Sequence, residues 1–250
     1  MIPANSVPRQ SGTRFKSIFS YYGGKSRIAH LYPAPVYGTI VEPFCGAAAY
    51  SALHYDRQVH LYDADPVTAS IWQFLLSPNA LDHCRFFIPD SVQPGMCISD
   101  FFTDYPDAPP GLIRLMQAEA NAGTQGARGV HDQITKFGAG GWPRFLPKME
   151  YWIPRIQHWT FTHVPDYTLI PNRPATWFID PPYNNPAGAR YRTQISDYNA
   201  LAGWCLSRLG QVIVCENEGA DWLPFTVLAP RRGVFSSYQK SQIREAVWVK

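Results

Sequence analysis

The chain of 250 residues has few charged side chains, no Cys-x-x-Cys pair and no long apolar run. Charged residues make up 16% of it, and the formal net charge is only +3. Such a small excess is compatible with a nucleic-acid partner but does not indicate one. No run of about 18 apolar residues is present, so nothing in the sequence indicates a membrane-spanning helix. We therefore expect no membrane partner.

The cysteines give no sign of a disulfide framework or of a metal site. Their number is odd, and no two have the spacing of a zinc-binding pair. The five are Cys45, Cys84, Cys97, Cys205 and Cys215. We expect no bound metal and a reducing compartment, the cytoplasm. The first 16 residues contain two prolines and no apolar run, so we expect neither a signal peptide nor an anchor there.

Apolar residues are abundant, with 46% of the chain hydrophobic and 14% aromatic. This is enough for one sizeable core with an inserted lobe. Residues 1–17 are interpreted as a flexible lead-in. Short apolar runs at residues 38–41 and 59–62 predict buried strands, and residues 47–55 and 66–76 predict helices. This alternation indicates an α/β fold with a doubly wound sheet.

The pattern changes between residues 77 and 150. A helix is predicted at residues 112–122, and a stretch without strand periodicity follows it. Its glycines are Gly123, Gly126, Gly129, Gly138, Gly140 and Gly141. We interpret residues 77–150 as an inserted, mainly helical lobe with mobile glycine-rich loops. Residues 18–76 and 151–250 then form one α/β domain.

The α/β pattern resumes after this lobe. Residues 176–179 and 211–215 predict buried strands, and residues 198–209 predict a helix between them. Two further segments, residues 226–228 and 246–250, are interpreted as edge strands.

The sequence Asp180-Pro181-Pro182-Tyr183 follows directly on the predicted strand 176–179. In open α/β sheets, ligands bind beyond the carboxyl ends of the strands. Prolines fix the backbone and offer carbonyls without donors, so this turn presents a carboxylate, a carbonyl and an aromatic ring. These groups suit a planar amine. Asp180 and the Pro181 carbonyl would accept hydrogen bonds from an NH2 group, and Tyr183 would stack on the attached ring. Alone, the motif could equally be an ordinary proline turn.

A second segment runs from a predicted strand through a tight turn into a helix. It reads Glu42-Pro43-Phe44-Cys45-Gly46 and continues into alanines. Such a turn lets a nucleotide-like cofactor approach the backbone and a helix N-terminus. About twenty residues further on, Asp63 ends the next strand, where an acid can hold ribose hydroxyls. By itself this signal is weak.

A third segment, Phe19 to Lys25, places aromatic residues before Gly23, Gly24 and Lys25. Tyr21 and its neighbours could form a wall, and aromatic rings attract a sulfonium cation. The full spacing of a phosphate-binding P-loop is absent, which excludes that reading.

In this order the three segments and Asp63 resemble the DNA adenine methylase family, the Dam-type enzymes. The resemblance covers residues 19–249, and residues 81–152 match poorly. It implies a Rossmann-like methyltransferase fold with a doubly wound mixed sheet and an inserted target-recognition lobe. It further implies S-adenosylmethionine as cofactor and a site-specific methyl transfer to N6 of adenine in double-stranded DNA. The target base would be flipped out of the duplex. We expect a monomer, in the cytoplasm of a bacterium or of a phage-infected cell.

The resemblance assigns roles to individual residues. The catalytic residues would be Asp180, Pro181, Pro182 and Tyr183. The cofactor-binding residues would be Tyr21, Gly23, Gly24, Lys25, Glu42, Pro43, Phe44, Gly46, Asp63, Asp166, Tyr167 and Asp180. The pair Asp166-Tyr167 resembles the Asp-aromatic pair that borders the cofactor's adenine in the family.

One position departs from the family pattern. Its second glycine of Gly-x-Gly is Ala48 in this chain. If the position needs positive φ, the Cβ of alanine costs about 1 kcal/mol. If it needs only a small residue, alanine is harmless.

Basic side chains are expected to hold the DNA phosphates. In the lobe they are interleaved with aromatic residues, and two more follow the catalytic turn. The candidates are Arg128, Lys136, Arg144, Lys148, Arg190 and Arg192. For each of them alone, a solvated surface charge is an equally good interpretation.

Two alternatives remain open at this stage. One is an amino-methyltransferase that acts on N4 of cytosine or on RNA, although Asp180 favours adenine. The other is a non-catalytic DNA-binding module derived from a methyltransferase, with cofactor binding lost through Ala48.

Overall fold

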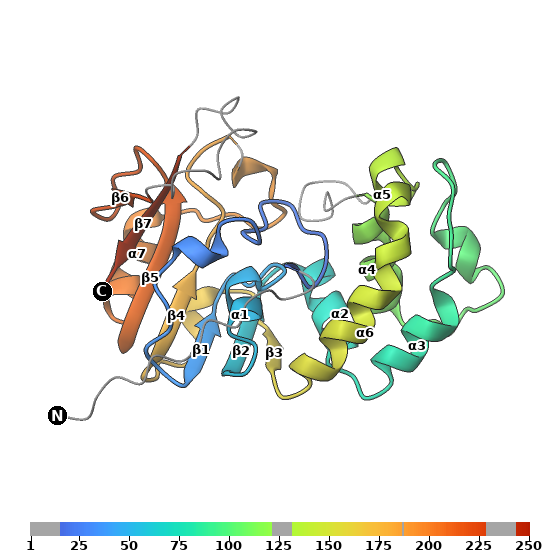
Figure 1. The fold of residues 1–250 in the computed structure, drawn as a ribbon. Coiled ribbons are helices and arrows are strands. Elements are labelled where there is room, and N and C mark those ends of the chain that lie inside the picture. The colour runs from blue at the N-terminus through green and yellow to red at the C-terminus, as the bar shows by residue number, and fades with distance from the viewer. Residues whose placement is uncertain (1–15, 122–131, 187, 229–243) are drawn as a thin grey trace.

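The computed structural model describes residues 16–121, 132–186, 188–228 and 244–250. The lead-in expected at residues 1–17 lies almost entirely outside this range. Within it, seven strands form one sheet in the order β3-β2-β1-β4-β5-β7-β6 (Figure 1). Their bounds are β1 (Thr39–Glu42), β2 (Gln58–Asp63), β3 (Thr160–His163), β4 (Ala175–Ile179), β5 (Gly210–Asn217), β6 (Thr226–Val227) and β7 (Glu245–Val249).

The first five strands run parallel to their neighbours. Strand β7 is antiparallel to both β5 and β6. The chain therefore has the Rossmann-like, doubly wound mixed sheet that the sequence predicts.

Helices cover both faces of this sheet and continue into a lobe beside it (Figure 1). The α-helices are α1 (Ala49–Leu53), α2 (Pro66–Leu75), α3 (Ala80–Phe87), α4 (Pro110–Ala120), α5 (Lys136–Gly141), α6 (Phe145–Ile156) and α7 (Tyr198–Leu206). Short 3-10 helices are η1 (Ala29–Leu31), η2 (Ser99–Phe102), η4 (Trp142–Arg144), η5 (Tyr167–Leu169) and η6 (Gly188–Arg190).

Neighbouring residues of the central strands belong to two different cores. Phe178 packs with Trp72 of α2 in one buried cluster. Trp177 packs with Trp204 of α7 in the other. Successive side chains of a strand point to opposite faces, so a strand covered on both sides is apolar throughout. All five residues of β4 are buried, which explains the unbroken apolar run in its sequence.

The strands predicted at residues 38–41, 59–62, 176–179 and 211–215 are confirmed as β1, β2, β4 and β5. Two expectations at the sheet margins need correction. The segment 246–250 is not an edge strand, because β7 lies between β5 and β6. The true edge opposite β6 is β3, which the sequence analysis missed because its residues are mostly exposed and polar.

The glycine-rich part of the lobe was expected to form loops. From residue 136 onward this is wrong, because Gly138, Gly140 and Gly141 lie in α5. A Cβ on Gly138 would lie 1.9 Å from the backbone oxygen of Ala120 in α4. Glycine here permits two helices to pack closely. The other glycines, Gly123, Gly126 and Gly129, lie outside the described residues.

The lobe also extends further than expected. Helix α6 crosses the boundary placed at residue 150 and ends at Ile156. Within the lobe α3 packs against α6, and α4 packs against α2 of the α/β domain. Among the described residues, every helix is too short or too polar to span a lipid bilayer.

A largely buried carboxylate, 11% exposed, joins the lobe to the N-terminal segment. Oε1 of Glu119, in α4, accepts hydrogen bonds from Lys148 Nζ at 2.6 Å and from the backbone N–H of Ser20 at 2.7 Å. Trp152 Nε1 donates to the backbone oxygen of Ser17 at 3.0 Å. The DNA contact expected of Lys148 is therefore wrong, because its side chain is buried and paired inside the protein.

We expect Lys148→Ala to lower the free energy of unfolding by about 3 kcal/mol, because Glu119 would stay buried without its cation. Arg144→Ala removes an exposed cation one turn earlier and should change it by less than about 0.5 kcal/mol. Urea denaturation followed by tryptophan fluorescence measures both. Equally small effects for the two variants would contradict a buried ion pair at Lys148.

Candidate functional site

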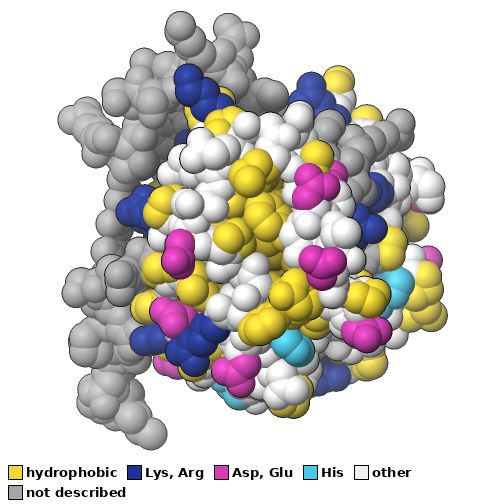
Figure 2. All heavy atoms as spheres, turned by 90° about the vertical axis from the view of Figure 1, so that its right-hand side faces the viewer, with side chains coloured by type: hydrophobic (Ala, Val, Ile, Leu, Met, Phe, Trp, Pro, Cys, Tyr) yellow, Lys and Arg dark blue, Asp and Glu magenta, His cyan; other side chains and the backbone are white. Residues whose placement is uncertain are grey.

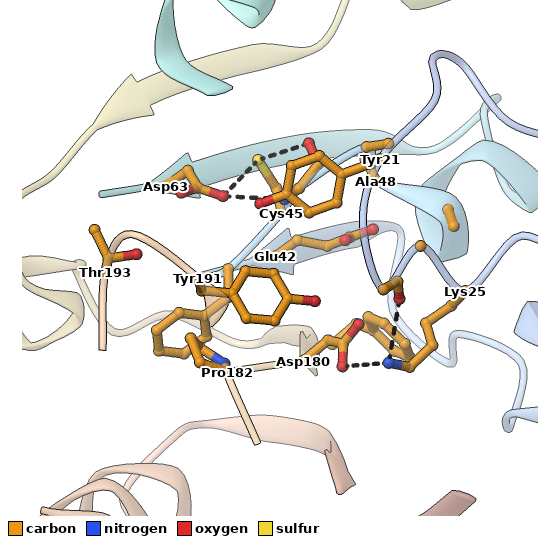
Figure 3. A pocket seen from close by; sticks show the side chains of 17 residues that line it. Tyr21, Lys25, Glu42, Cys45, Ala48, Asp63, Asp180, Pro182, Tyr191 and Thr193 are labelled. Carbon is orange, nitrogen blue, oxygen red and sulfur yellow. Dashed lines mark hydrogen bonds and ion pairs between the residues drawn. The ribbon is translucent and has the colours of Figure 1, made fainter. Parts of the chain in front are cut away.

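A cavity opens beyond the carboxyl ends of β1, β2 and β4 (Figure 3). The strand order reverses between β1 and β4, the place where open α/β sheets bind their ligands. The cavity has about 540 Å³ of empty space, a volume that includes open solvent at its mouth. It is lined by Tyr21, Gly23, Gly24, Lys25, Glu42, Phe44, Cys45, Gly46, Ala47, Ala48, Ala49, Asp63, Phe178, Asp180, Pro182, Tyr191 and Thr193. All three predicted segments and Asp63 therefore meet here.

The turn after β1 is held from several sides. The backbone N–H of Gly46 donates to Asp63 Oδ2 at 3.0 Å, and its carbonyl accepts from Trp72 Nε1 at 2.7 Å. Gly46 has φ +46°, and a Cβ there would lie 2.7 Å from the ring of Tyr21. Only glycine fits this conformation and this contact. The turn thus brings backbone to the cavity surface.

Asp63 supports this turn as well as lining the cavity. Its Oδ2 accepts from Gly46, and its Oδ1 accepts from the backbone N–H of Asp65 at 2.9 Å. Burial raises the pKa of Asp63 to about 6, although these hydrogen bonds act in the opposite direction. A ligand hydroxyl that bound Asp63 would therefore share its carboxylate with the backbone N–H groups of Gly46 and Asp65.

Ala48 adopts a left-handed backbone conformation, with φ 49° and ψ 48°. It is the one residue other than glycine with positive φ among the described parts of the chain. The departure from the family pattern therefore falls where the backbone favours glycine, and the expected cost of the Cβ is about 1 kcal/mol. The Ala48 side chain is wholly buried in the core.

The strain at Ala48 can be measured against its neighbour. Both Ala48→Gly and Ala49→Gly remove a buried methyl group, but Ala49 is the first residue of α1. We expect Ala48→Gly to be the less destabilising by about 1 kcal/mol, because it also relieves the left-handed strain. Thermal and urea unfolding of both variants test this. Equal losses of stability would contradict strain at Ala48.

Glu42 ends β1 and is only 2% exposed. Its Oε1 accepts from the backbone N–H of Ser51 at 2.9 Å and from Ser51 Oγ at 2.5 Å. Burial raises the pKa of Glu42 to about 8, and the two hydrogen bonds from Ser51 only partly oppose this. The carboxyl group therefore changes its charge near neutral pH in the folded protein.

This pKa predicts a pH dependence of stability. The folded-state pKa of Glu42 lies above its ordinary value of 4.5, so its contribution is present at low pH and is lost as the pH rises towards 8. The loss is at most about 1.4 kcal/mol per pH unit. Glu42→Gln should therefore gain stability relative to wild type between pH 5 and pH 8, with Glu218→Gln as an exposed control. A difference that does not change with pH would argue against this.

An ion pair joins the N-terminal segment to the turn after β4. Lys25 Nζ lies 3.0 Å from Asp180 Oδ1 and 3.8 Å from Oε1 of Glu245, in β7. Burial by itself would lower the pKa of Lys25, but the two carboxylates outweigh it and the pKa is raised. Lys25 is therefore a cation that faces Asp180 (Figure 3). The sequence analysis assigned Lys25 to the cofactor and did not predict this pair.

Tyr183 is not among the residues that line the cavity. Its hydroxyl donates to Glu245 Oε1, and Lys25 Nζ lies 4.5 Å from the centre of its ring. The preceding carbonyl, of Pro182, accepts from the hydroxyl of Tyr198 at 2.7 Å. The turn from Asp180 to Tyr183 is therefore fixed by groups from β7 and α7 that lie outside the recognised motifs.

Tyr191 and Thr193 line the cavity but were not predicted. Tyr191 faces Tyr21 with ring centroids 6.4 Å apart, and its hydroxyl donates to the backbone oxygen of Tyr22 at 3.1 Å. A Cβ on Gly23 would lie 1.9 Å from that hydroxyl oxygen. The polar segment after the Asp180–Tyr183 turn is thus folded back onto the Gly-Gly-Lys segment. Tyr191 is the one aromatic residue in residues 184–197, and this was the sequence signal that could have indicated its place in the cavity.

Asp166 and Tyr167 do not line the cavity. Asp166 Oδ1 accepts from the backbone N–H and Oγ1 of Thr168, which makes it the cap of η5. Tyr167 lies between Phe44 and Trp204, with ring centroids at 5.7 Å and 5.1 Å. Its link to the cavity therefore passes through Phe44. Pro43 and Pro181 also lie outside the lining.

Among the described residues, Asp180, Cys215 and Glu245 place possible metal ligands within 4.8 Å of one another. The ammonium group of Lys25 already lies beside both carboxylates. This positive charge would repel a metal ion at the same place.

The proposed DNA contacts have different surroundings. Lys136, Arg144 and Arg190 are exposed. Arg192 Nη1 lies 3.4 Å from Asp65 Oδ2 at the start of α2, so this cation is engaged within the protein. Arg128 lies outside the described residues.

No family model and no curated protein matches the chain. Among solved structures, the chain is similar to the rRNA methyltransferase aviRa from Streptomyces viridochromogenes. The two are 12% identical, with a TM-score of 0.36 over 92% of this chain and 96% of that one. A likeness of this degree does not bear on the activity of the chain.

Proposed function

We propose that this protein is a methyltransferase that uses S-adenosylmethionine and methylates N6 of adenine in DNA, as the resemblance to Dam-type enzymes implies. The observation that carries the proposal is the position of Asp180. It follows the last residue of β4, lines the cavity and is held by Lys25 at 3.0 Å. A carboxylate at the edge of a cavity beyond the strand ends is where an amine would have to be received.

The cavity residues fit S-adenosylmethionine. The positive φ of Gly46 brings backbone to the cavity surface, and a Cβ there would strike Tyr21. Asp63 offers carboxylate oxygens to ribose hydroxyls. The rings of Tyr21, Phe44 and Tyr191 supply faces for adenine and for a sulfonium cation. When bound, S-adenosylmethionine supplies an activated methyl group, so no metal is required.

The chain's own groups orient the target amine. The lone pair of an aromatic amine is delocalised into its ring, and acceptors at its two N–H groups favour localisation on nitrogen. Asp180 Oδ1 is bound by Lys25. Oδ2 would accept one N–H, and the carbonyl of Pro181 would accept the other. The nitrogen must also release a proton, which Asp180 can receive.

DNA would approach the side of the molecule on which η6 and α5 lie. Figure 1 shows η6, which contains Arg190, above the strands and α5, which contains Lys136, at the upper end of the lobe. Phe137 beside Lys136 is 84% exposed. Basic and apolar side chains together suit phosphate contacts and insertion between bases.

The outer face of the lobe is a poorer candidate. Figure 2 shows hydrophobic side chains along its middle, with Asp and Glu as well as Lys and Arg around them. A surface of mixed sign does not attract a polyanion.

We expect Asp180→Ala to reduce the single-turnover rate of methyl transfer by about 10²–10³-fold, because one preorganised acceptor is lost. The dissociation constant for S-adenosylmethionine, measured by calorimetry, should change far less. Asp107→Ala, which removes an exposed carboxylate in the lobe, is the control. Nucleoside analysis of the product by mass spectrometry identifies the methylated base.

Different outcomes separate the alternatives. A wild-type rate for folded Asp180→Ala would remove the catalytic assignment. N4-methylcytosine, or methylated RNA without methylated DNA, would replace the proposed substrate. No detectable binding of S-adenosylmethionine to the wild-type protein would favour a non-catalytic DNA-binding module.

A further inference from the structure

Glu245 is the first residue of β7 and lies far from the recognised motifs in sequence. Its backbone pairs with Asn217 at the end of β5. Its carboxylate reaches the back of the catalytic turn and meets groups from three other parts of the chain. These are Tyr32, which follows η1, Lys25 of the Gly-Gly-Lys segment, and Tyr183 of the catalytic turn.

One oxygen atom of Glu245 makes these contacts. Oε1 accepts a hydrogen bond from the hydroxyl of Tyr32 at 2.6 Å and another from the hydroxyl of Tyr183. Lys25 Nζ lies 3.8 Å from the same atom. A hydroxyl fixed at the end of a phenol ring restricts how the ring can tilt. Two such bonds to one oxygen hold the ring of Tyr183 to the core residue Tyr32.

The same carboxylate acts on Asp180 through Lys25. The ammonium group lies between the two carboxylates, closer to Asp180 at 3.0 Å than to Glu245 at 3.8 Å. It also lies 4.5 Å from the centre of the Tyr183 ring. Lys25 therefore contacts both Asp180 and the ring of Tyr183, and the carboxylate of Glu245 lies beside the same ammonium group.

We propose that Glu245 is a positioning residue of the active site, which sets the plane of the Tyr183 ring and the place of the Lys25 ammonium group against Asp180. The inference rests on the proposed function and on the expectation from the sequence that Tyr183 stacks on the target base. Glu245 itself does not line the cavity and touches no substrate. A stacking ring that is displaced by about 1 Å lowers the rate of a well-oriented reaction by up to about 10²-fold.

Glu245→Ala removes the acceptor, and Glu245→Gln keeps an amide oxygen that can still accept from both hydroxyls. We expect Glu245→Ala to lower the single-turnover rate of methyl transfer by about 10–100-fold. Glu245→Gln should restore a large part of that loss. The dissociation constant for S-adenosylmethionine should change less than about threefold in either variant. Glu218→Ala, whose exposed carboxylate pairs with Arg244 next to Glu245, is the matched control and should keep the wild-type rate.

Tyr183→Phe tests whether Glu245 acts through the tyrosine hydroxyl. In a protein that already lacks this hydroxyl, Glu245→Ala should lower the rate by a smaller factor than in the wild-type protein. Equal factors in the two backgrounds would overturn the inference. A wild-type rate for folded Glu245→Ala would overturn it too.

A second readout does not depend on activity. The ¹³Cζ resonance of Tyr183, assigned by its disappearance in Tyr183→Phe, should shift in Glu245→Ala and stay unchanged in Glu218→Ala. An unchanged Tyr183 resonance in Glu245→Ala would overturn the positioning role. If the wild-type protein methylated no nucleic acid, the proposed function would fail, while this resonance would still decide whether Glu245 holds Tyr183.

Discussion

The ion pair between Lys25 and Asp180 connects the parts of the chain that form the cavity. Lys25 belongs to the N-terminal segment, and Asp180 belongs to the turn after β4. The two side chains are only 11% and 20% exposed, so either charge alone would be poorly solvated. The charge of Asp180 is therefore compensated by Lys25 only when the N-terminal segment is in place. Gly23 and Gly24, which directly precede Lys25 in the sequence, line the cavity together with it. The ion pair therefore holds two walls of the cavity together.

Much of the site was predictable because parallel strands end at one edge of a sheet. Glu42, Asp63 and Asp180 each lie at the carboxyl end of a strand, and apolar runs mark these strands in the sequence. Three motifs at three strand ends must therefore converge once the sheet is parallel. The question about Ala48 could also be posed from the sequence, although only the backbone conformation answers it.

Other features depend on packing between distant segments, which no local pattern records. Glu245 and Tyr183 are 62 residues apart, and nothing near Glu245 in the sequence indicates its partner. Lys148 looked like a surface cation because its buried partner, Glu119, lies on another helix. Gly138 was interpreted as part of a loop because glycine is common there, whereas here it lets α5 approach α4.

The carboxylate of Glu119 has a mechanical consequence. One of its oxygens binds both Lys148 of α6 and the backbone of Ser20, which immediately precedes the cavity residue Tyr21. A displacement of α6 in the lobe would therefore act on the cavity wall through this shared oxygen atom. Thermodynamic reciprocity then applies: if a partner that binds the lobe changes the affinity of the cavity for its ligand, that ligand changes the affinity for the partner by the same factor. The two binding events would be coupled through Glu119 without either ligand touching the other.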